Sequence, residues 1–382
     1  MSGEPTTLTR SNQLDLAQET LPAIQLSLIS GIGSRTVQTL VNHFGNLAAV
    51  FRASHEELVS LPGVGPKLAR KILENRDGST AQSELERLQQ AGVQFLLRGS
   101  EEYPTLLDDI PDAPQILYYK GTIEPVDGLA IAIVGSRRCT PYGLGQAHKI
   151  AGALARAGVT VVSGLARGID AAAHRGALET GGRTLAVFAT GLGTVYPPEH
   201  KDLAEQVSKQ GALITESCFD QLPIAGLFPQ RNRIISGLSL GVILIEASRK
   251  SGALHTARHA MEQGREVFSV PGRIDSIESQ GCLDLIRDGA TLIRGVEDIL
   301  DELGPLTKPV QTKHKGEVRQ PIELNLNDQE TEILNALTSD PKHIDEVLRT
   351  VTLDSSRVLS TLTVLEMKNL VRRHPGNYLS RP

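Results

Sequence analysis

Five segments of this sequence combine glycine with other turn-forming or hydroxyl residues, and most of them also carry arginine or lysine. Glycine lets backbone N–H groups approach an anion closely, and a nearby cation neutralises its charge. This pattern is typical of phosphate binding, provided that the fold brings the segments together. The five segments are residues 135–137, 163–170, 190–193, 228–237 and 250–257.

The first two of these segments belong to one predicted βαβ unit. Residues 129–134 and 159–162 are apolar and rich in β-branched side chains, as strands of a buried parallel sheet are. Between them, Thr140 is a good N-cap and Pro141 fits the first turn of a helix that stops before Gly158. The carboxyl ends of parallel strands meet at one edge of a sheet, so we expect the turns that follow both strands to lie together there.

Further apolar strands recur along the chain, each separated from the next by a helical pattern. This alternation predicts an α/β protein with a doubly wound, extended Rossmann-like parallel sheet. An earlier helix and two strands, at 93–97 and 116–121, form the opening edge of that sheet in this interpretation. The later strands are expected at residues 184–189, 212–215, 242–246, 267–270 and 291–293.

The window from residue 225 to residue 260 is locally basic, although the whole chain is slightly acidic. Its single acidic residue, Glu246, leaves a local excess of four positive charges. A basic surface of this kind would concentrate phosphate groups at the sheet edge. The basic residues of the window are Arg231, Arg233, Arg249, Lys250 and Arg258.

The part of the chain before the sheet is predicted to be helical. Residues 1–20 are expected to be a disordered tail, and residues 21–80 contain a near-repeat, Gly31-Ile32-Gly33 and Gly63-Val64-Gly65. Each copy precedes an amphipathic helix, which is similar to a tandem helix-hairpin-helix (SAM-like) domain. Two interpretations stay open with equal weight, namely sequence-independent DNA contact and a docking domain in which the glycines only make turns.

The part of the chain after the sheet is predicted to be a separate domain. Residues 301–323 are rich in Pro, Lys, Thr and Gln without periodicity, which indicates a linker between a domain at 81–300 and one at 324–382. The last segment has three helical patterns and a hairpin around Pro375-Gly376-Asn377, typical of a winged helix. It could read DNA or dock a protein, and residues 357–382 contain five basic side chains against Glu366 alone.

Composition restricts the class of protein. The 382 residues include 39 basic and 44 acidic side chains, so bulk charge does not indicate a nucleic-acid partner. Three separated cysteines without a C-x-x-C pair argue against disulfides and zinc, and His255 and His259 lack the further ligand of a zinc helix. We expect a cytoplasmic protein without a membrane span, because the first 20 residues are polar and the chain has no long apolar run.

Several catalytic motifs are missing or occur in the wrong context. The chain has no G-x-x-x-x-G-K-[ST] phosphate loop, and residues 190–193 lack the third glycine of a dinucleotide site. The string at 237–241 matches G-x-S-x-G, but a nucleophile elbow requires the order strand, turn, helix, and this string follows a helix. We therefore treat that match as chance.

These segments, together with Tyr103-Pro104-Thr105-Leu106-Leu107 and Val270-Pro271-Gly272, resemble the DNA-processing protein A family (DprA, also called Smf). The resemblance runs from about residue 101 to residue 299. It implies an extended Rossmann-like domain, a homodimer, binding of single-stranded DNA, and delivery of that DNA to the RecA recombinase during natural transformation. It implies no catalytic residue, cofactor or metal.

By this resemblance, the DNA-binding residues lie in the turns described above. The principal contacts would be Arg137, Ser163, Arg167, Phe228, Arg231 and Lys250, supported by Asn232 and Ser251. The neighbouring turn residues of the predicted site are Gly135, Ser136, Gly164, Gly168, Arg233 and Gly252. The family usually has an asparagine shortly after Gly281, near the position where this chain has Leu283, so we assign no DNA contact to that loop.

An enzymatic alternative comes from the same superfamily, which includes phosphoribohydrolases that cleave nucleoside monophosphates. In that case Glu216 or Glu246, each at the end of a predicted strand, would be the acid. Those enzymes carry a P-G-G-x-G-T turn followed by a catalytic glutamate, whereas residues 190–194 lack both the proline and the glutamate. DNA binding is the favoured interpretation.

Overall fold

The computed structural model describes residues 10–306, 308–312 and 316–381. The chain divides into two compact units, one that extends to Ile293 and one that begins at Arg294. The first contains the sheet and the N-terminal helices, and the second contains the C-terminal domain.

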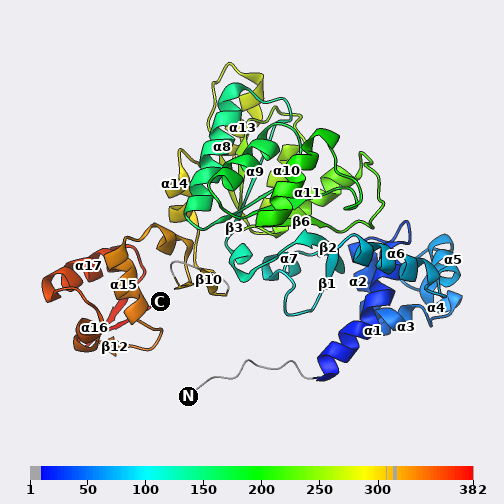
Figure 1. Cartoon of the computed structure of the whole chain (residues 1–382), viewed down its shortest axis with the longest axis horizontal. Coiled ribbons are helices and arrows are strands. Elements are labelled where there is room, and N and C mark those ends of the chain that lie inside the picture. Colours follow the sequence, from blue (N-terminus) through cyan, green and yellow to red (C-terminus); the bar gives the residue numbers. More distant parts are fainter. Residues whose placement is uncertain (1–9, 307, 313–315, 382) are drawn as a thin grey trace. The chain divides into compact units, whose positions relative to one another are not determined.

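The first unit is built on one sheet of nine strands, which confirms the α/β prediction (Figure 1). The strand order is β1-β2-β6-β5-β4-β3-β7-β8-β9. The pairs from β6 to β9 are parallel, whereas β1 and β2 pair in antiparallel fashion and form the predicted opening edge. The strands are β1 Gln94–Leu97, β2 Ile116–Gly121, β3 Ala130–Gly135, β4 Thr160–Ser163, β5 Thr184–Val187, β6 Gly211–Thr215, β7 Gly241–Ile245, β8 Glu266–Ser269 and β9 Thr291–Leu292.

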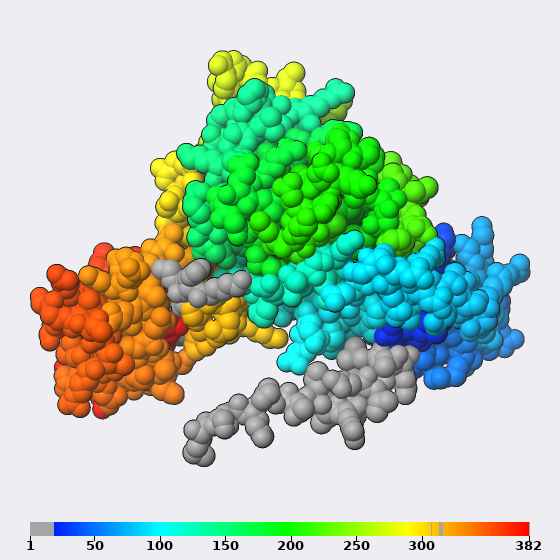
Figure 2. All heavy atoms as spheres, viewed as in Figure 1, coloured from blue at the N-terminus to red at the C-terminus, as the bar shows by residue number. Residues whose placement is uncertain are grey.

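Side chains of these strands point alternately to two helix layers. At the end of β5, Val187 packs with one layer, while its neighbours Ala186 and Phe188 pack with the other. The first layer consists of α7 (Thr105–Asp108), α11 (Leu227–Gly237), α12 (Ala253–Glu262) and α13 (Gln280–Arg287). The second layer contains α9 (Ile169–Glu179) and α10 (Lys201–Gln210), with α8 (Pro141–Arg156) packed against α9. Figure 2 shows the atoms of α8 to α10 as a continuous surface.

The βαβ unit that the sequence predicts is present as β3, α8 and β4. Thr140 caps α8 by accepting a hydrogen bond from the Gly143 N–H at 3.3 Å, and Pro141 occupies the first turn. Helices α8 and α9 approach closely at Gly176. A side chain would not fit there, since an added Cβ would lie 2.2 Å from the His148 carbonyl oxygen. This glycine lets the two helices pack without a spacer between their backbones.

The N-terminal helices share a hydrophobic core with the sheet edge. Buried Leu97, Ile116 and Tyr118 of β1 and β2 pack with side chains of the helical segment. Our expectation of disorder for residues 10–20 is wrong, because α1 begins at Arg10, while residues 1–9 lie outside the described part of the chain. Extending an existing helix costs far less free energy than starting one, so the packed half of α1 supports the preceding turns. The helices are α1 Arg10–Ser27, α2 Ser34–Phe44, α3 Leu47–Val50, α4 His55–Val59, α5 Pro66–Glu74 and α6 Ser79–Gln90.

The second unit contains the predicted winged helix. A three-stranded sheet of order β12-β14-β13 packs with three helices around one core. The segment that we predicted to be an irregular linker instead contains a short hairpin of β10 (Val310–Thr312) and β11 (Gly316–Val318). The remaining elements are α14 Val296–Glu302, η4 Pro321–Asn325, α15 Asp328–Ala336, β12 Lys342–His343, α16 Ile344–Thr350, α17 Ser355–Met367, β13 Arg372–His374 and β14 Tyr378–Ser380. Among the described residues, no helix is long and apolar enough to cross a membrane.

Candidate nucleic-acid interface

The turn between β3 and α8 presents two arginines to solvent. Gly135 is required there, because an added Cβ would lie 1.9 Å from the Ile245 carbonyl oxygen. The next residue, Ser136, accepts a hydrogen bond from the Arg138 backbone N–H at 3.1 Å, which tightens the turn. The side chains of Arg137 and Arg138 are exposed, and neither forms an ion pair with a residue that the structure describes. Both guanidinium groups are therefore free to bind an anion.

The N-terminus of α8 is occupied by a carboxylate of the protein itself. Glu246, at the end of β7, accepts hydrogen bonds from the Thr140 backbone N–H at 2.7 Å and from the Thr140 hydroxyl. An added Cβ at Gly143 would lie 2.4 Å from a carboxylate oxygen of Glu246. A helix N-terminus is a common phosphate site, but here the buried carboxylate already provides the negative charge.

The turn between β4 and α9 is also closed by an internal carboxylate. Asp170 is buried and accepts hydrogen bonds from the backbone N–H groups of Gly164 at 3.2 Å and Ala166 at 3.3 Å. The buried Ser163 hydroxyl donates to the Ile133 carbonyl oxygen at 2.6 Å. The polar groups that the sequence offered to a phosphate at this turn are thus satisfied within the fold.

The end of the same turn crosses the β3–α8 turn closely. Gly168 has φ of +75°, and an added Cβ would lie 2.4 Å from the Ser136 carbonyl oxygen. The neighbouring Arg167 is exposed and forms an ion pair with Glu199. Hydrogen bonding within this pair raises the pKa of Arg167 and lowers the pKa of Glu199. Arg167 therefore lies at the surface of the sheet edge with a partner already in place.

One face of α11 forms a wall of a pocket at this sheet edge. Phe228, Arg231, Asn232 and Ile235 recur at helical spacing and line it together. The Arg137 guanidinium carbon lies 5.2 Å from the Phe228 ring centroid, within the range of a cation–π interaction.

Two further contacts place this wall. The Tyr196 ring lies 5.6 Å from the Phe228 ring in an edge arrangement, and Tyr196 is partly exposed. The Asn232 amide donates a long hydrogen bond of 3.4 Å to the Gly252 carbonyl oxygen, which connects α11 to the turn before α12. An aromatic pair and a free cation thus lie side by side at the sheet edge.

Arg231 is a buried residue of the pocket lining. Its side chain is buried and donates hydrogen bonds to the carbonyl oxygens of Gly164, at 2.8 Å, and Val187. Burial lowers the pKa of Arg231 to about 10, while the negative charge of Asp170 acts in the opposite direction. The guanidinium still carries its charge at neutral pH, but some of its N–H donors are already bonded to backbone carbonyl oxygens.

Arg233 lies on the opposite side of α11, contrary to its expected place among the DNA-facing residues. Its guanidinium pairs with Glu216 and Asp112 and donates a hydrogen bond of 3.1 Å to the Ser34 hydroxyl. Residues two positions apart on a helix point in nearly opposite directions, so Arg231 and Arg233 cannot face one pocket. The basic excess counted along the sequence is therefore partly neutralised by distant acidic residues.

The turn between β7 and α12 contributes backbone and hydroxyl groups to the pocket. Ser251 and Gly252 line it, and the Ser251 hydroxyl accepts a hydrogen bond from the Ala253 N–H at 3.3 Å. Lys250 is exposed and has no ion pair within the described part of the chain, but its side chain does not line the pocket. Arg249 beside it pairs with Asp284 at 2.7 Å.

These turns enclose one hollow of about 770 Å³, which we call the strand-end pocket. The predicted residues that line it are Gly135, Ser136, Arg137, Phe228, Arg231, Asn232, Ser251 and Gly252. The predicted residues that do not line it are Ser163, Gly164, Arg167, Gly168, Arg233 and Lys250. The functional roles of both groups stay predictions.

The pocket also contains residues outside the predicted set, among them Arg138, Tyr196 and Glu278. Arg138 could have been found, since it belongs to the turn already selected. Tyr196 and Glu278 come from loops without a local motif, so only the fold identifies them.

The glycine turn at 190–193 serves a different purpose from the one expected. The N–H groups of Gly191 and Gly193 donate to the carbonyl oxygens of Gln221, at 2.9 Å, and Phe219, at 3.0 Å. An added Cβ at Gly191 would lie 2.0 Å from the Cys218 carbonyl oxygen. These glycines join two loops of the chain and do not line the strand-end pocket.

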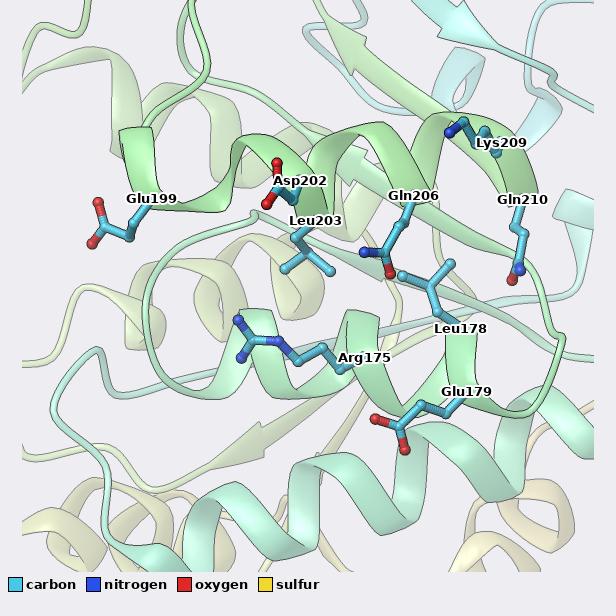
Figure 3. A pocket seen from close by; sticks show the side chains of 9 residues that line it. All are labelled: Arg175, Leu178, Glu179, Glu199, Asp202, Leu203, Gln206, Lys209 and Gln210. Carbon is cyan, nitrogen blue, oxygen red and sulfur yellow. The ribbon is translucent and has the colours of Figure 1, made fainter.

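A second hollow, of about 480 Å³, lies between α9 and α10 (Figure 3). Figure 3 shows Gln206 directed from α10 toward α9, and Arg175 extended along α9. Three carboxylates and two cations line it, and it lies on the helix layer rather than at the strand ends. Its mixed charge makes it a weaker candidate for a phosphate-bearing ligand.

In the winged helix, ion pairs use most of the basic side chains that suggested DNA contact. The described pairs are Arg357 with Asp354, Lys368 with Glu330, Arg373 with Glu366, and Arg381 with Glu323. Arg372 is the exception among the five, since the structure describes no ion pair for it. The apparent positive charge of this segment therefore does not by itself favour DNA over a protein partner.

The fold and the site define a Rossmann-like α/β protein with a basic, aromatic pocket at its strand ends, flanked by a helix-hairpin-helix segment and a winged helix. Comparison with known proteins agrees in each part. Residues 94–304 match the family model of DNA recombination-mediator protein A, residues 317–377 match the DprA winged helix domain, and residues 24–75 match the SAM-like helix-hairpin-helix tandem. The chain belongs to the DNA-processing protein A (DprA/Smf) family.

Individual relatives cover much of the chain. Protein Smf of Synechocystis is 35% identical over 381 residues, which cover 92% of this chain and 96% of the relative. DNA processing protein DprA of Streptococcus pneumoniae is 43% identical over 200 residues, 52% of this chain and 71% of the relative. The crystal structure of that S. pneumoniae protein aligns with a TM-score of 0.64 and 32% identity, covering 73% of this chain and 95% of the other.

A second solved structure is described as showing the single-stranded DNA binding mode of DNA processing protein A from Helicobacter pylori. It aligns with a TM-score of 0.50 and 32% identity, covering 54% of this chain and 93% of the other.

Proposed function

We propose that this protein binds single-stranded DNA at the strand-end pocket and delivers it to a RecA-type recombinase, without catalysing a reaction itself. The observation that carries the proposal is the presence in one pocket of Arg137 and Arg138, for which the described residues provide no ion pair, and of the rings of Phe228 and Tyr196. Cations neutralise a phosphate backbone and aromatic rings stack on bases, which is the combination that single-strand binders use.

The shape of the site favours a single strand over a duplex. The cations and rings line a recess, rather than a protruding helix or ribbon that would fit a major groove. A base that is free of its partner strand can enter a pocket of about 770 Å³. The description of the H. pylori relative as a single-stranded DNA binder supports the same assignment.

The two acids considered for the hydrolase alternative, Glu216 and Glu246, both have partners within the described part of the chain. Glu246 caps α8 through two hydrogen bonds to Thr140, and Glu216 pairs with Arg233 on the side of α11 opposite the pocket residues. Burial raises the pKa of Glu216, with Arg233 acting in the opposite direction. Ser239 of the G-x-S-x-G string is buried and donates to the Ile235 carbonyl oxygen at 2.9 Å, so it is not a nucleophile.

The partners in this proposal are single-stranded DNA, a RecA-type recombinase and a second copy of the chain. Membership in the DprA/Smf family supports them. The proposal places the protein in the cytoplasm, where a recombinase would receive incoming DNA during natural transformation.

Fluorescence anisotropy with a labelled single strand and the duplex of the same sequence tests the binding proposal. We expect clear preference for the single strand, and equal affinity for the duplex would contradict it. Incubation with nucleoside monophosphates should release no free base. Release of many base molecules per protein molecule would support the hydrolase instead. Delivery is tested by the DNA-dependent ATP hydrolysis of the recombinase, which the protein should accelerate on strands covered by a competing single-strand binder.

A further inference from the structure

Glu278 is the pocket residue that phosphate binding does not explain. It lies in the short helix η3 (Ile277–Ser279), is partly buried and lines the strand-end pocket together with the arginine turn. Its negative charge acts on Cys139, which directly follows Arg138, so the two walls are close. A carboxylate in this position would repel a phosphate, and a pocket built only for phosphates would not place one there.

The loop that carries Glu278 is held firmly in place. The Gly281 N–H donates to the Ala247 carbonyl oxygen at 2.7 Å, and the Tyr142 hydroxyl donates to the Pro271 carbonyl oxygen at 2.9 Å. Ser279 beside it is buried. Both ends of the loop are thus hydrogen-bonded to neighbouring segments, which restricts the positions that Glu278 can take.

Glu278 is also unpaired, unlike the other carboxylates near it. Asp275 in the same loop pairs with Arg273 at 2.8 Å, and Asp170 in the pocket accepts two backbone hydrogen bonds. For Glu278, the structure describes neither a hydrogen bond nor an ion pair within the residues that it covers. An acceptor that is partly buried and has no partner fits a ligand that brings a donor.

We propose that Glu278 reads the base in the strand-end pocket by accepting a hydrogen bond from an exocyclic amino group. This inference rests on the proposed function, because it requires a strand bound by the arginine turn. Cytosine presents its N4 amino group, whereas thymine presents the O4 carbonyl at the same position, which would repel the carboxylate. The pocket should therefore bind cytosine better than thymine. Adenine and guanine also carry amino groups, but their larger rings would change stacking and fit as well. The comparison of cytosine with thymine therefore isolates the hydrogen bond better.

The test compares oligodeoxycytidine and oligodeoxythymidine of about twelve nucleotides, a typical site length, by anisotropy above neutral pH, where cytosine N3 is unprotonated. The quantity of interest is the ratio of the two dissociation constants, Kd for thymidine over Kd for cytidine, in each protein. Using the change in this ratio between variants removes differences in strand flexibility. The variants are E278A, E278Q and, as a matched control from the same loop, D275A.

We expect E278A to lower the ratio by at least about five-fold, the lower end of one base-specific contact. E278Q offers both an acceptor for cytosine N4 and a donor for thymine O4, so it should also lower the ratio, while D275A should leave the ratio unchanged. All variants should melt at the wild-type temperature.

The inference is wrong if E278A leaves the ratio unchanged. It is also wrong if E278A strengthens both oligonucleotides equally, because then the carboxylate only repels phosphates. If the wild-type protein binds neither oligonucleotide, the proposed function fails rather than this inference. A variant at Arg137 separates the two ideas further, since it should weaken both oligonucleotides alike and keep their ratio.

Discussion

Replacing Arg137 with alanine is the most direct test of the phosphate role of the β3–α8 turn. The side chain is exposed and described without an ion pair, so its removal should change the free energy of unfolding by no more than about 0.5 kcal/mol. If it contacts one phosphate, the magnitude of the salt slope of single-strand binding should fall by roughly 0.7. Between about 50 and 200 mM salt, the binding defect of R137A should therefore shrink by about 2.6-fold.

A charge-conserving variant separates the charge of Arg137 from its contact with Phe228. R137K should keep the wild-type salt slope, because the ammonium still displaces one counterion. It should lose part of the cation–π contact that is described at 5.2 Å, which is worth about 0.5–1 kcal/mol at an exposed site.

The matched control is R249A, which removes an exposed arginine from the neighbouring turn. That arginine already pairs with Asp284 at 2.7 Å, so we expect near wild-type binding. Titrations by anisotropy at several salt concentrations measure all three variants. If R137A binds with wild-type affinity and salt slope, or if R249A causes the same defect, the assignment of the phosphate contact is refuted.

Three further predictions concern the ring, the C-terminal unit and acid stability. F228A should weaken single-strand binding by about 1–3 kcal/mol with an unchanged salt slope, and an early thermal transition would instead show that the ring is mainly core. Deleting residues 307–382 should leave most single-strand affinity, and loss of nearly all binding in a folded truncated protein would contradict the assignment to the strand-end pocket. Burial lowers the pKa of His174 to about 3 from 6.5, so the unfolded chain binds a proton that the folded chain does not. The contribution of neutral His174 to the free energy of unfolding should therefore be fully present above pH 6.5. Denaturant titrations should show that the free energy of unfolding falls by about 2 kcal/mol from pH 7 to pH 5, a loss that H174Q should not share.

The sequence by itself was enough to predict the elements that depend on local order. Thr140 and Pro141 begin α8 as expected, because capping and the fixed backbone angle of proline act within one turn. Alternating strand and helix patterns predict the parallel sheet, and a parallel sheet places the ends of β3 and β4 at one edge. The arginine turn at Arg137 could be selected for the same reason, whereas the ring of Phe228 was assigned by the resemblance to the family.

What only the tertiary structure decided is which charged groups remain free. Arg231 and Arg233 are close in the sequence, yet one is buried near Asp170 and the other pairs with Glu216. Electrostatic partners are set by distance in space, so a count of charges along the chain includes cations that the fold has already neutralised. The same reason explains why Glu278 could not be predicted as a pocket residue. Its position depends on packing between loops that are far apart in the sequence, and no local pattern records that packing.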